Sequence, residues 1–420
     1  CISRGDGAAT VSGKAQPIRT IPLHKQYVPV VKGEKTVAYK TAYFGKVHAG
    51  SPAREFTVVF DTGSGHLVLP SASCLSQTCM KHRRFNRTDS STAVDIESDG
   101  SPVRAGAEER DMMTIAFGTG EILGEFVRET VCIGDAPASS ADAGAIVAAS
   151  ADAPRAGCAK IRVVLAKTMS EDPFGLFAFD GVLGLGLSAL TLSPAFNFFA
   201  SMTGQDPSIP PLFAVFLSRH DKGSSAISFG GHEERYASTD FFWAPVAREE
   251  LGFWHVQIKS VRVGGKELED CADGGCGAIL DTGTSLLGVP KQSARALHRM
   301  LARPVPNNPD GTIASSAADV DCRSVAGLPI EFELGDGAVV MLYPEDYSRP
   351  QPFNMTVPGS ERAAPSSSRL FCRSLLLPLE MGPPLGNRVF IWGEPVLRRY
   401  YTVYDTGAKR IGFSVARQQA

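Results

Sequence analysis

Apolar positions along this chain fall mostly in short runs rich in Val, Ile, Phe and Thr, separated by residues that favour turns. Short β-branched and aromatic runs bounded by Gly and Pro are typical of strands. The clearest exception is KQSARALHRMLA, residues 291–302, whose apolar residues recur at helical spacing after Pro290. The 42 Gly and 28 Pro agree with many turns. We therefore expect a mostly β protein with few helices.

Length, composition and charge limit the classes of protein to consider. With 420 residues and 43% hydrophobic content, the chain can bury a large core, and we expect two or three domains. No apolar run of the roughly 18 residues needed to span a bilayer is free of charge. A formal charge of -2 gives no electrostatic reason to expect nucleic acid or an anionic membrane as a partner. The sequence starts at Cys1, without Met or an apolar leader, so we expect a targeting segment upstream of it.

Two of the cysteine spacings are short. Cys74 and Cys79 form one close pair, and Cys271 and Cys276 form another. Each pair can close a small loop as a disulfide. Because His82 follows the first pair, zinc is the competing interpretation, but the spacing is not that of a zinc ribbon and no second ligand pair matches it. We expect disulfides and no metal site.

Two glycosylation triplets, NRT at Asn86 and NMT at Asn354, accompany these cysteines. Such triplets are common by chance, but disulfides form in oxidising compartments. Together the two features predict a protein of the secretory pathway.

The tripeptide Asp-Thr-Gly occurs three times, beginning at Asp61, Asp281 and Asp405. The first two copies match further, with a hydroxyl residue three positions after the Asp, Leu six after it and Pro nine after it. The third copy lacks this match and continues instead into Lys409 and Arg410. That context is typical of a β-hairpin turn, in which Asp and Gly suit the backbone geometry. We expect chemistry at the first two copies only.

A second element repeats downstream of each of these two loops. An apolar pair of residues followed by Gly occurs at Leu183-Gly184 after Asp61, and at Trp392-Gly393 after Asp281. Each half of the chain thus carries one Asp loop and one later apolar segment ending in Gly. We infer two similar lobes, each supplying one carboxylate.

Seven stretches follow one another in a specific order: YFGKVHAGSPAREFTVVFDTGS, FNRTDSST, IAFGTGE, FDGVLGLG, ISFGG, AILDTGTS and YYTVYDTGAKRIGF. In this order they resemble the pepsin-like aspartic endopeptidases of the pepsin and cathepsin D type, from about Thr36 to the C-terminus. The resemblance implies an all-β, bilobal fold of two related β-barrel-like lobes with the active-site cleft between them. We expect an N-terminal segment at 1–35, which resembles a remnant prosegment, an N-terminal lobe with the flap at 36–222, and a C-terminal lobe at 223–420.

The chemistry follows from the paired carboxylates. Two carboxylates within hydrogen-bonding distance cannot both ionise cheaply, so the pair holds one shared proton in acidic solution. A water between Asp61 and Asp281 would lose a proton to the ionised carboxylate and attack the peptide carbonyl, while the protonated carboxyl donates to the carbonyl oxygen. This reaction requires no metal and no cofactor.

The resemblance therefore implies a monomeric endopeptidase that cuts polypeptides at acidic pH and is inhibited by pepstatin-type compounds. It implies neither a nucleic-acid partner nor a membrane span. We expect it outside the cell or in an acidic lysosome- or vacuole-like compartment. The competing interpretation is a catalytically silent relative that binds peptides or a protein without cutting them. Silent relatives usually have a damaged Asp loop, and both loops are intact here.

The resemblance also assigns supporting roles in the two loops. In each loop the threonine braces the other loop through backbone hydrogen bonds, the glycine lets the backbone approach the carboxylates, and the next hydroxyl residue hydrogen-bonds the outer carboxylate oxygen. These residues are Thr62, Gly63, Ser64, Thr282, Gly283 and Thr284.

Apolar residues line the expected flap and first pocket, so we expect a preference for large hydrophobic side chains beside the scissile bond. The flap residues are Ile115, Phe117, Gly118 and Thr119, and the pocket residues are Phe174, Phe177 and Phe179. Phe174 and Phe177 are equally well explained as core.

The flap departs from the family at two positions at once. Most relatives join a flap Tyr to a Trp that follows the first Asp loop, but here these positions hold Phe117 and Val68. Replacing both polar partners leaves no unsatisfied group. We expect a flap that closes by apolar packing and is more mobile without substrate.

The family pattern implies three disulfides, Cys74–Cys79, Cys271–Cys276 and Cys322–Cys372. From the remaining cysteines we infer a fourth, Cys132–Cys158, pinning an Ala-rich insertion, with Cys1 left odd.

The segment IRTIPLHK at 18–25 resembles the first strand of the inhibitory segment of pepsin-like zymogens, which typically lends a Lys to the catalytic carboxylates. The usual helical, basic remainder of such a segment is missing here, and Lys32, Lys35 and Lys40 are only possible substitutes. A permanent strand of the mature protein at 18–31 is an equally good interpretation.

Overall fold

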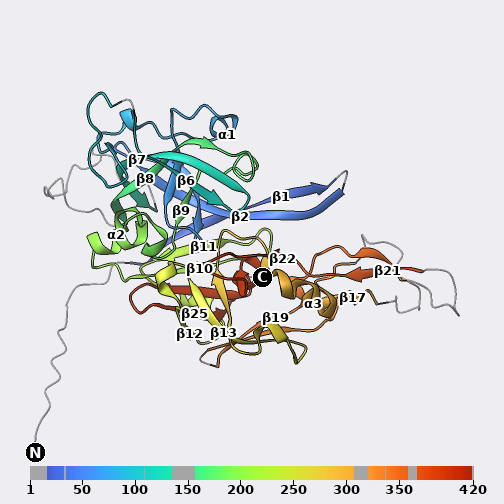
Figure 1. The fold of residues 1–420 in the computed structure, drawn as a ribbon. Coiled ribbons are helices and arrows are strands. Elements are labelled where there is room, and N and C mark those ends of the chain that lie inside the picture. Colours follow the sequence, from blue (N-terminus) through green and yellow to red (C-terminus); the bar gives the residue numbers. More distant parts are fainter. Residues whose placement is uncertain are drawn as a thin grey trace, which may run out of the picture.

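The fold is a computed structural model that describes residues 17–32, 35–107, 109–134, 157–306, 320–335, 337–357 and 367–418. Strands dominate it and helices are few and short, so the predicted all-β class is confirmed. Figure 1 shows strands of the first half of the chain gathered in one lobe and strands of the second half in another, with β10 and β11 between them. Cys1 and most of the Ala-rich insertion lie outside the described residues.

The largest sheet has 14 strands and contains the N-terminal half of the chain. Its order is β12 (Phe242–Pro245), β25 (Arg410–Val415), β24 (Tyr400–Asp405), β10 (Leu212–Phe216), β11 (Ser225–Phe229), β1 (Arg19–Lys32), β2 (Lys35–Ala49), β3 (Arg54–Asp61), β9 (Gly181–Gly184), β4 (Leu67–Pro70), β8 (Cys158–Met169), β7 (Gly120–Ile133) and β5 (Val94–Ile96), with β6 (Met112–Phe117) paired to β7. Residues 218–225, which include the expected boundary between the lobes, connect β10 to β11 in the part of the sheet to which both ends of the chain contribute.

Two smaller sheets complete the C-terminal half. The eight-stranded sheet has the order β19 (Val339–Leu342), β18 (Ile330–Leu334), β13 (His255–Val263), β15 (Cys276–Leu280), β23 (Val389–Trp392), β16 (Leu287–Pro290) and β22 (Leu376–Leu379), with β14 (Lys266–Glu267) paired to β13. The three-stranded sheet consists of β17 (Arg303–Pro304), β21 (Ser367–Cys372) and β20 (Phe353–Val357).

Five short helices lie among the strands of the described residues. They are α1 (Gln77–Met80), α2 (Phe198–Gln205), α3 (Lys291–Leu301), α4 (Pro344–Tyr347) and α5 (Glu394–Leu397). The predicted helix is confirmed as α3, which ends one residue earlier than expected. Ala294, Leu297 and Leu301 are buried on one side of it, as the helical spacing of apolar residues requires.

The internal repeat of the sequence is a repeat of strand pairing. In the first half, β3 runs parallel to β9, and β9 pairs antiparallel with β4. In the second half, β15 runs parallel to β23, and β23 pairs antiparallel with β16. Each Asp loop therefore leaves the end of a central strand and returns on the other side of the strand that carries the apolar segment ending in Gly. This equivalence places both loops at corresponding points of the two halves.

The third Asp-Thr-Gly is the turn of the β24–β25 hairpin, as predicted, with Asp405 paired to Arg410 in register. Its carboxylate accepts a hydrogen bond from the Ala408 backbone N–H at 2.8 Å and contacts the Arg410 Nε at 3.1 Å. This carboxylate therefore serves the turn, and Asp405 takes no part in the site described below.

The described residues contain four disulfides, which join the pairs that we expected: Cys74–Cys79, Cys132–Cys158, Cys271–Cys276 and Cys322–Cys372. Since Cys74 and Cys79 are bonded to each other, neither is a thiolate available to zinc. The nearby His82 ring instead contacts the Phe174 carbonyl oxygen at 2.9 Å.

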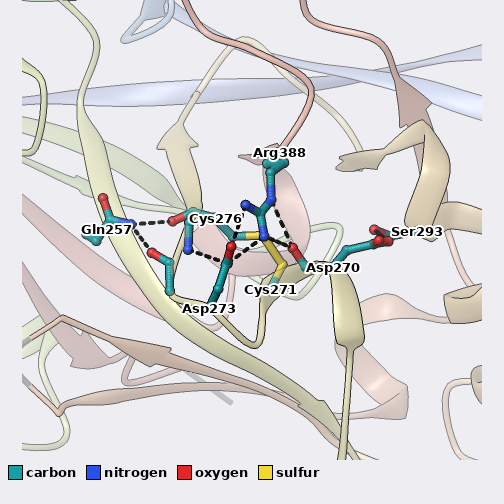
Figure 2. Close-up of a disulfide and its surroundings, with 9 residues drawn as sticks. Gln257, Asp270, Cys271, Asp273, Cys276, Ser293 and Arg388 are labelled. Carbon is teal, nitrogen blue, oxygen red and sulfur yellow. Dashed lines mark hydrogen bonds and ion pairs between the residues drawn. A yellow bond between two sulfur atoms is a disulfide. The ribbon is translucent and has the colours of Figure 1, made fainter.

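The Cys271–Cys276 loop is also held by polar contacts (Figure 2). The Arg388 guanidinium hydrogen-bonds both oxygens of Asp273, at 2.9 and 2.5 Å. Gln257 donates to the Cys276 carbonyl oxygen at 2.9 Å. Because β15 begins at Cys276 and runs straight into Asp281, this fastened loop anchors the strand that presents the second aspartate.

Candidate active site

The first Asp loop begins where β3 ends. Asp61 is the last residue of β3 and is only 8% exposed. Its backbone is held in the sheet, since the Leu185 N–H donates to the Asp61 carbonyl oxygen at 2.7 Å. Its carboxylate accepts a hydrogen bond from the Gly63 N–H at 2.9 Å. Backbone pairing on one side and the tight turn on the other thus fix the direction of the carboxylate.

The second Asp loop has the same construction at the end of β15. Asp281 accepts a hydrogen bond at Oδ1 from the Gly283 N–H at 2.8 Å and another at Oδ2 from the Thr284 hydroxyl at 2.6 Å. The equivalent hydroxyl in the first loop behaves differently. Among the described residues Ser64 Oγ is buried and has no hydrogen-bond partner. The expected hydrogen bond to the outer carboxylate oxygen is therefore present in the second loop, from Thr284, and missing in the first loop, from Ser64.

The two carboxylates face each other across the junction of the lobes. A Cβ added to Gly63 would lie 2.8 Å from Cγ of Asp281, and one added to Gly283 would lie 2.7 Å from Oδ1 of Asp61. Real Cβ atoms do not tolerate such distances, so each loop needs glycine where it passes the aspartate of the other loop. The structure thus brings together two aspartates that are 220 residues apart in the sequence.

Reciprocal threonine hydrogen bonds lock the two loops together. The Thr62 N–H donates to Thr282 Oγ1, and the Thr282 N–H donates to Thr62 Oγ1, both at 3.0 Å. Each hydroxyl then donates to the strand of the other lobe: Thr62 to the Leu280 carbonyl oxygen at 2.8 Å and Thr282 to the Phe60 carbonyl oxygen at 2.5 Å. Four hydrogen bonds therefore set the spacing of the two aspartates.

Burial and the neighbouring carboxylate raise the pKa of Asp61 to about 7. Burial is the larger cause, because the charged form loses its hydration, and repulsion from Asp281 adds to it. A carboxyl with such a pKa keeps its proton in acidic solution. The pair can therefore offer one protonated and one ionised carboxyl at the same time.

The expected flap is the hairpin of β6 and β7, in which Phe117 pairs with Gly120. Its turn is made by Gly118, which has a φ of +55° that favours glycine, and by Thr119. The Phe117 ring meets the Phe174 ring edge to face, with centroids 5.5 Å apart. Phe174 belongs to a buried apolar cluster that also contains Val68, and Ile115 and Phe117 pack against this cluster.

The three residues expected to line the first pocket are nearly inaccessible. Phe174, Phe177 and Phe179 are 1%, 7% and 4% exposed. They lie in one apolar cluster beneath Phe117. In this conformation they form core under the flap, which favours the core interpretation of Phe174 and Phe177 over a wall open to solvent.

Two lysines of the first half of the chain have acidic partners other than Asp61 and Asp281. Lys25 lies 3.5 Å from a Glu394 oxygen and 3.6 Å from an Asp221 oxygen. Lys40 forms an ion pair with Asp172 at 2.6 Å and reaches the flap residue Thr119 at 3.5 Å. In the part of the chain that the structure describes, neither Lys25 nor Lys40 therefore pairs with Asp61 or Asp281, as the lysine of a zymogen's inhibitory segment would. Sequence reasoning missed Glu394, and the only available signal was its position directly after Trp392-Gly393.

The two glycosylation triplets lie at different kinds of site. Asn354 is an exposed residue of β20. Asn86 is half-buried and caps a short helical turn, with its side-chain oxygen accepting the Thr88 N–H at 3.3 Å and its amide donating to Asp89 at 2.9 Å. In the described part of the chain, no helix is both long and apolar enough to cross a membrane.

Comparison with known proteins agrees with this geometry. The family described as "Eukaryotic aspartyl protease" matches residues 42–416. Human gastricsin is 29% identical over 392 residues, which are 91% of this chain and 85% of gastricsin. Cathepsin E of Rattus norvegicus is 30% identical over 89% of this chain and 80% of its own length, and pepsin A of Bos taurus is 30% identical over 89% and 84%. The chain therefore belongs to the eukaryotic aspartyl protease family.

Proposed function

We propose that this protein is an active acid endopeptidase that hydrolyses peptide bonds with a water activated between Asp61 and Asp281. The observation that carries the proposal is the reciprocal approach of the two loops: a Cβ added to Gly63 would lie 2.8 Å from Cγ of Asp281, and one added to Gly283 would lie 2.7 Å from Oδ1 of Asp61. Only a pair of carboxylates at close range can divide the roles of acid and base in this way. Both loops also keep every residue whose loss would silence them: the two aspartates, both glycines and both threonines.

The reaction begins with one proton on the carboxyl pair. The ionised carboxylate takes a proton from the water as its oxygen attacks the peptide carbonyl carbon, and the protonated carboxyl donates to the carbonyl oxygen. The resulting tetrahedral diol collapses when a proton reaches the leaving nitrogen, and the C–N bond breaks. The raised pKa of Asp61 supports this division, since one carboxyl must remain protonated in the free enzyme.

The substrate lies under the flap in this proposal, with large hydrophobic side chains beside the scissile bond. The apolar cluster of Ile115, Phe117 and Phe174 supports that preference. A polar substrate side chain placed against this cluster would find no hydrogen-bond partner, which is unfavourable. Gly118 and Thr119 offer backbone groups to the extended peptide. Phe179 packs against the ring of Phe174, with ring centroids 6.4 Å apart. Phe177 stacks in turn on Phe179, with ring centroids 5.5 Å apart.

The broader setting follows from the same features. Four disulfides support a route through an oxidising compartment. We place the enzyme in the secretory pathway, acting as a monomer outside the cell or in an acidic lysosome- or vacuole-like compartment. We also assign the N-terminal lobe to 36–222 and the C-terminal lobe to 223–420.

The experiment is proteolysis of an unfolded protein at acidic pH, with and without a pepstatin-type inhibitor. The proposal expects turnover that the inhibitor abolishes and that is lost in Asp281→Ala. A folded wild-type protein that binds the inhibitor or peptides but cuts none at any acidic pH would refute the proposal and identify a silent binding member of the family.

A further inference from the structure

A cluster of charges lies behind the second Asp loop, and the proposed reaction does not use it. Lys25 on β1 and Glu394 on α5 are its centre, with side chains 7% and 10% exposed and the Lys25 Nζ 3.5 Å from the Glu394 Oε1. The same Glu394 oxygen accepts a hydrogen bond from the Tyr43 hydroxyl at 2.7 Å. Arg398 and the exposed Asp221 complete the cluster, 3.4 Å from Glu394 and 3.6 Å from Lys25. We call these five residues the Lys25 cluster.

The cluster is connected to a catalytic carboxylate through a short chain of hydrogen bonds. The Glu394 N–H donates to the Thr284 carbonyl oxygen at 2.9 Å. The Thr284 hydroxyl donates to Asp281 Oδ2 at 2.6 Å. Glu394 therefore holds the backbone of the residue that orients Asp281.

A second connection joins the same loop to the N-terminal hairpin. The Thr41 N–H donates to Ser285 Oγ, and the Ser285 hydroxyl donates back to the Thr41 carbonyl oxygen, both at 2.8 Å. Thr41 and Tyr43 lie on β2, which pairs with β1 from His24 onward. The β1–β2 hairpin thus holds the second Asp loop at Ser285 and, through Glu394, at Thr284.

Strand β1 is an interior strand of the large sheet. Its first half pairs with β11, from Arg19 opposite Phe229 to Leu23 opposite Ser225, and its second half pairs with β2. Removing β1 would leave unpaired backbone groups on both neighbouring strands. It would also take away the buried side chains of Ile21 and Leu23 and expose the core residues that they contact. If activation removed this segment, the large sheet would lose the backbone hydrogen bonds that β1 forms with β11 and β2.

We propose that Lys25 is a positioning residue of the working enzyme, which neutralises Glu394 and so holds the second Asp loop in register with the first. It follows that residues 19–32 remain part of the active protein and are not an inhibitory segment. This inference rests on the proposed function for its kinetic consequence, but its structural consequence stands without it.

Because Lys25 and Glu394 are both buried, the loss of either charge should affect the other strongly. Desolvation lowers the pKa of Lys25, and its nearest carboxylates oppose that shift. A buried carboxylate that loses one partner cation is poorly compensated, whereas removing both charges together can be nearly neutral. Glu394 would keep Tyr43 and the partly exposed Arg398, so losing Lys25 should shift the loop without unfolding the lobe.

The kinetic test compares Lys25→Met with Lys25→Arg and with the double variant Lys25→Met/Glu394→Gln. We expect Lys25→Met to lower kcat about tenfold with KM within about twofold, because the carboxylate pair and not the substrate cleft is displaced. Lys25→Arg and the double variant should each recover most of that loss. The matched control is Lys46→Met, which removes an exposed lysine of β2 that pairs with Glu55 at 2.9 Å and should leave both constants unchanged.

Two further measurements keep the inference falsifiable whatever the kinetics give. A thermal-unfolding cycle over Lys25→Met, Glu394→Gln and the double variant should show strong coupling, with each single lowering Tm by about 5 °C and the double by less than their sum. N-terminal sequencing of inhibitor-titrated active enzyme should find β1 retained. Additive unfolding effects, an unchanged kcat in Lys25→Met, or full activity in protein that has lost residues 19–32 would each overturn the inference. A stable wild type that cuts nothing would refute the proposed function alone, since the unfolding cycle requires no turnover.

Discussion

The raised pKa of the Asp61 carboxyl predicts that the protein loses stability as the pH rises from about 4 to about 7. Below its ordinary value of 3.8, this carboxyl is protonated in the folded and the unfolded chain alike. Above that value the unfolded chain releases the proton, while the folded chain keeps it until about pH 7. The unfolded state is therefore increasingly favoured across this window, and the penalty is complete above it.

The magnitude follows from the difference between the two proton affinities. At about 1.4 kcal/mol for each tenfold change in proton affinity, a rise from 3.8 to about 7 corresponds to about 4 kcal/mol of unfolding free energy. Asp61 is 8% exposed, so solvent screening reduces this figure little. Such a loss is a large share of the 5–15 kcal/mol that typically stabilises a folded protein.

The assay is urea unfolding of the wild type and of Asp61→Asn at about pH 4 and about pH 7, the two ends of the window. An asparagine cannot ionise, so the fall in unfolding free energy should be smaller in the variant by about 4 kcal/mol. Asp405→Asn is the matched control, because it removes the carboxyl of the third Asp-Thr-Gly and leaves Asp61 and Asp281 in place. Equal falls in the wild type and in Asp61→Asn would refute the reasoning, since the Asp61 proton would then contribute nothing to stability across this window.

Three further predictions concern activity. Asp281→Ala should abolish cleavage while folded Asp405→Asn cuts normally, as measured by release of acid-soluble peptides; inactivity of folded Asp405→Asn would mean that the wrong pair was chosen. Phe117→Ala should lower kcat/KM about 3- to 10-fold, because it removes the edge-to-face contact with Phe174, which is worth about 0.5–1.5 kcal/mol beyond its buried area; an unchanged kcat/KM would mean that Phe117 does not hold the flap. A metal chelator should leave acid proteolysis unaffected, and strong inhibition by chelation would contradict the two-carboxylate mechanism.

The space around Val68 limits which substitutions can test the closure of the flap. Restoring the hydrogen bond common in the family would require Val68→Trp together with Phe117→Tyr. Val68 is 1% exposed, and its strand β4 pairs with β8 and β9 on its two sides. An indole at this position would overpack the core at a cost of about 1–3 kcal/mol. Phe117→Ala is therefore the cleaner test of flap closure.

Features set by local chemistry could be predicted from the sequence. The helix at 291–301 follows from apolar spacing after a proline, and the hairpin at Asp405 follows from a turn sequence between two β-type runs. The repeat of Asp loop and apolar segment ending in Gly marked the two equivalent strand arrangements. Each of these depends on residues within a few positions of one another, so the pattern along the chain carries the information.

Features that depend on contacts between distant segments were decided only by the tertiary structure. The distance between the two aspartates, the burial that raises the Asp61 pKa and the missing hydrogen bond of Ser64 all arise from how two loops meet across the lobes. Lys25 shows the limit most clearly, because the resemblance of residues 18–25 to an inhibitory strand named no partner for it, and the fold places it beside Glu394. A charge pairs with whatever opposite charge the fold buries beside it. That choice depends on the contact between Lys25 on β1 and Glu394 on α5, which are more than 350 positions apart in the sequence, and no local pattern records it.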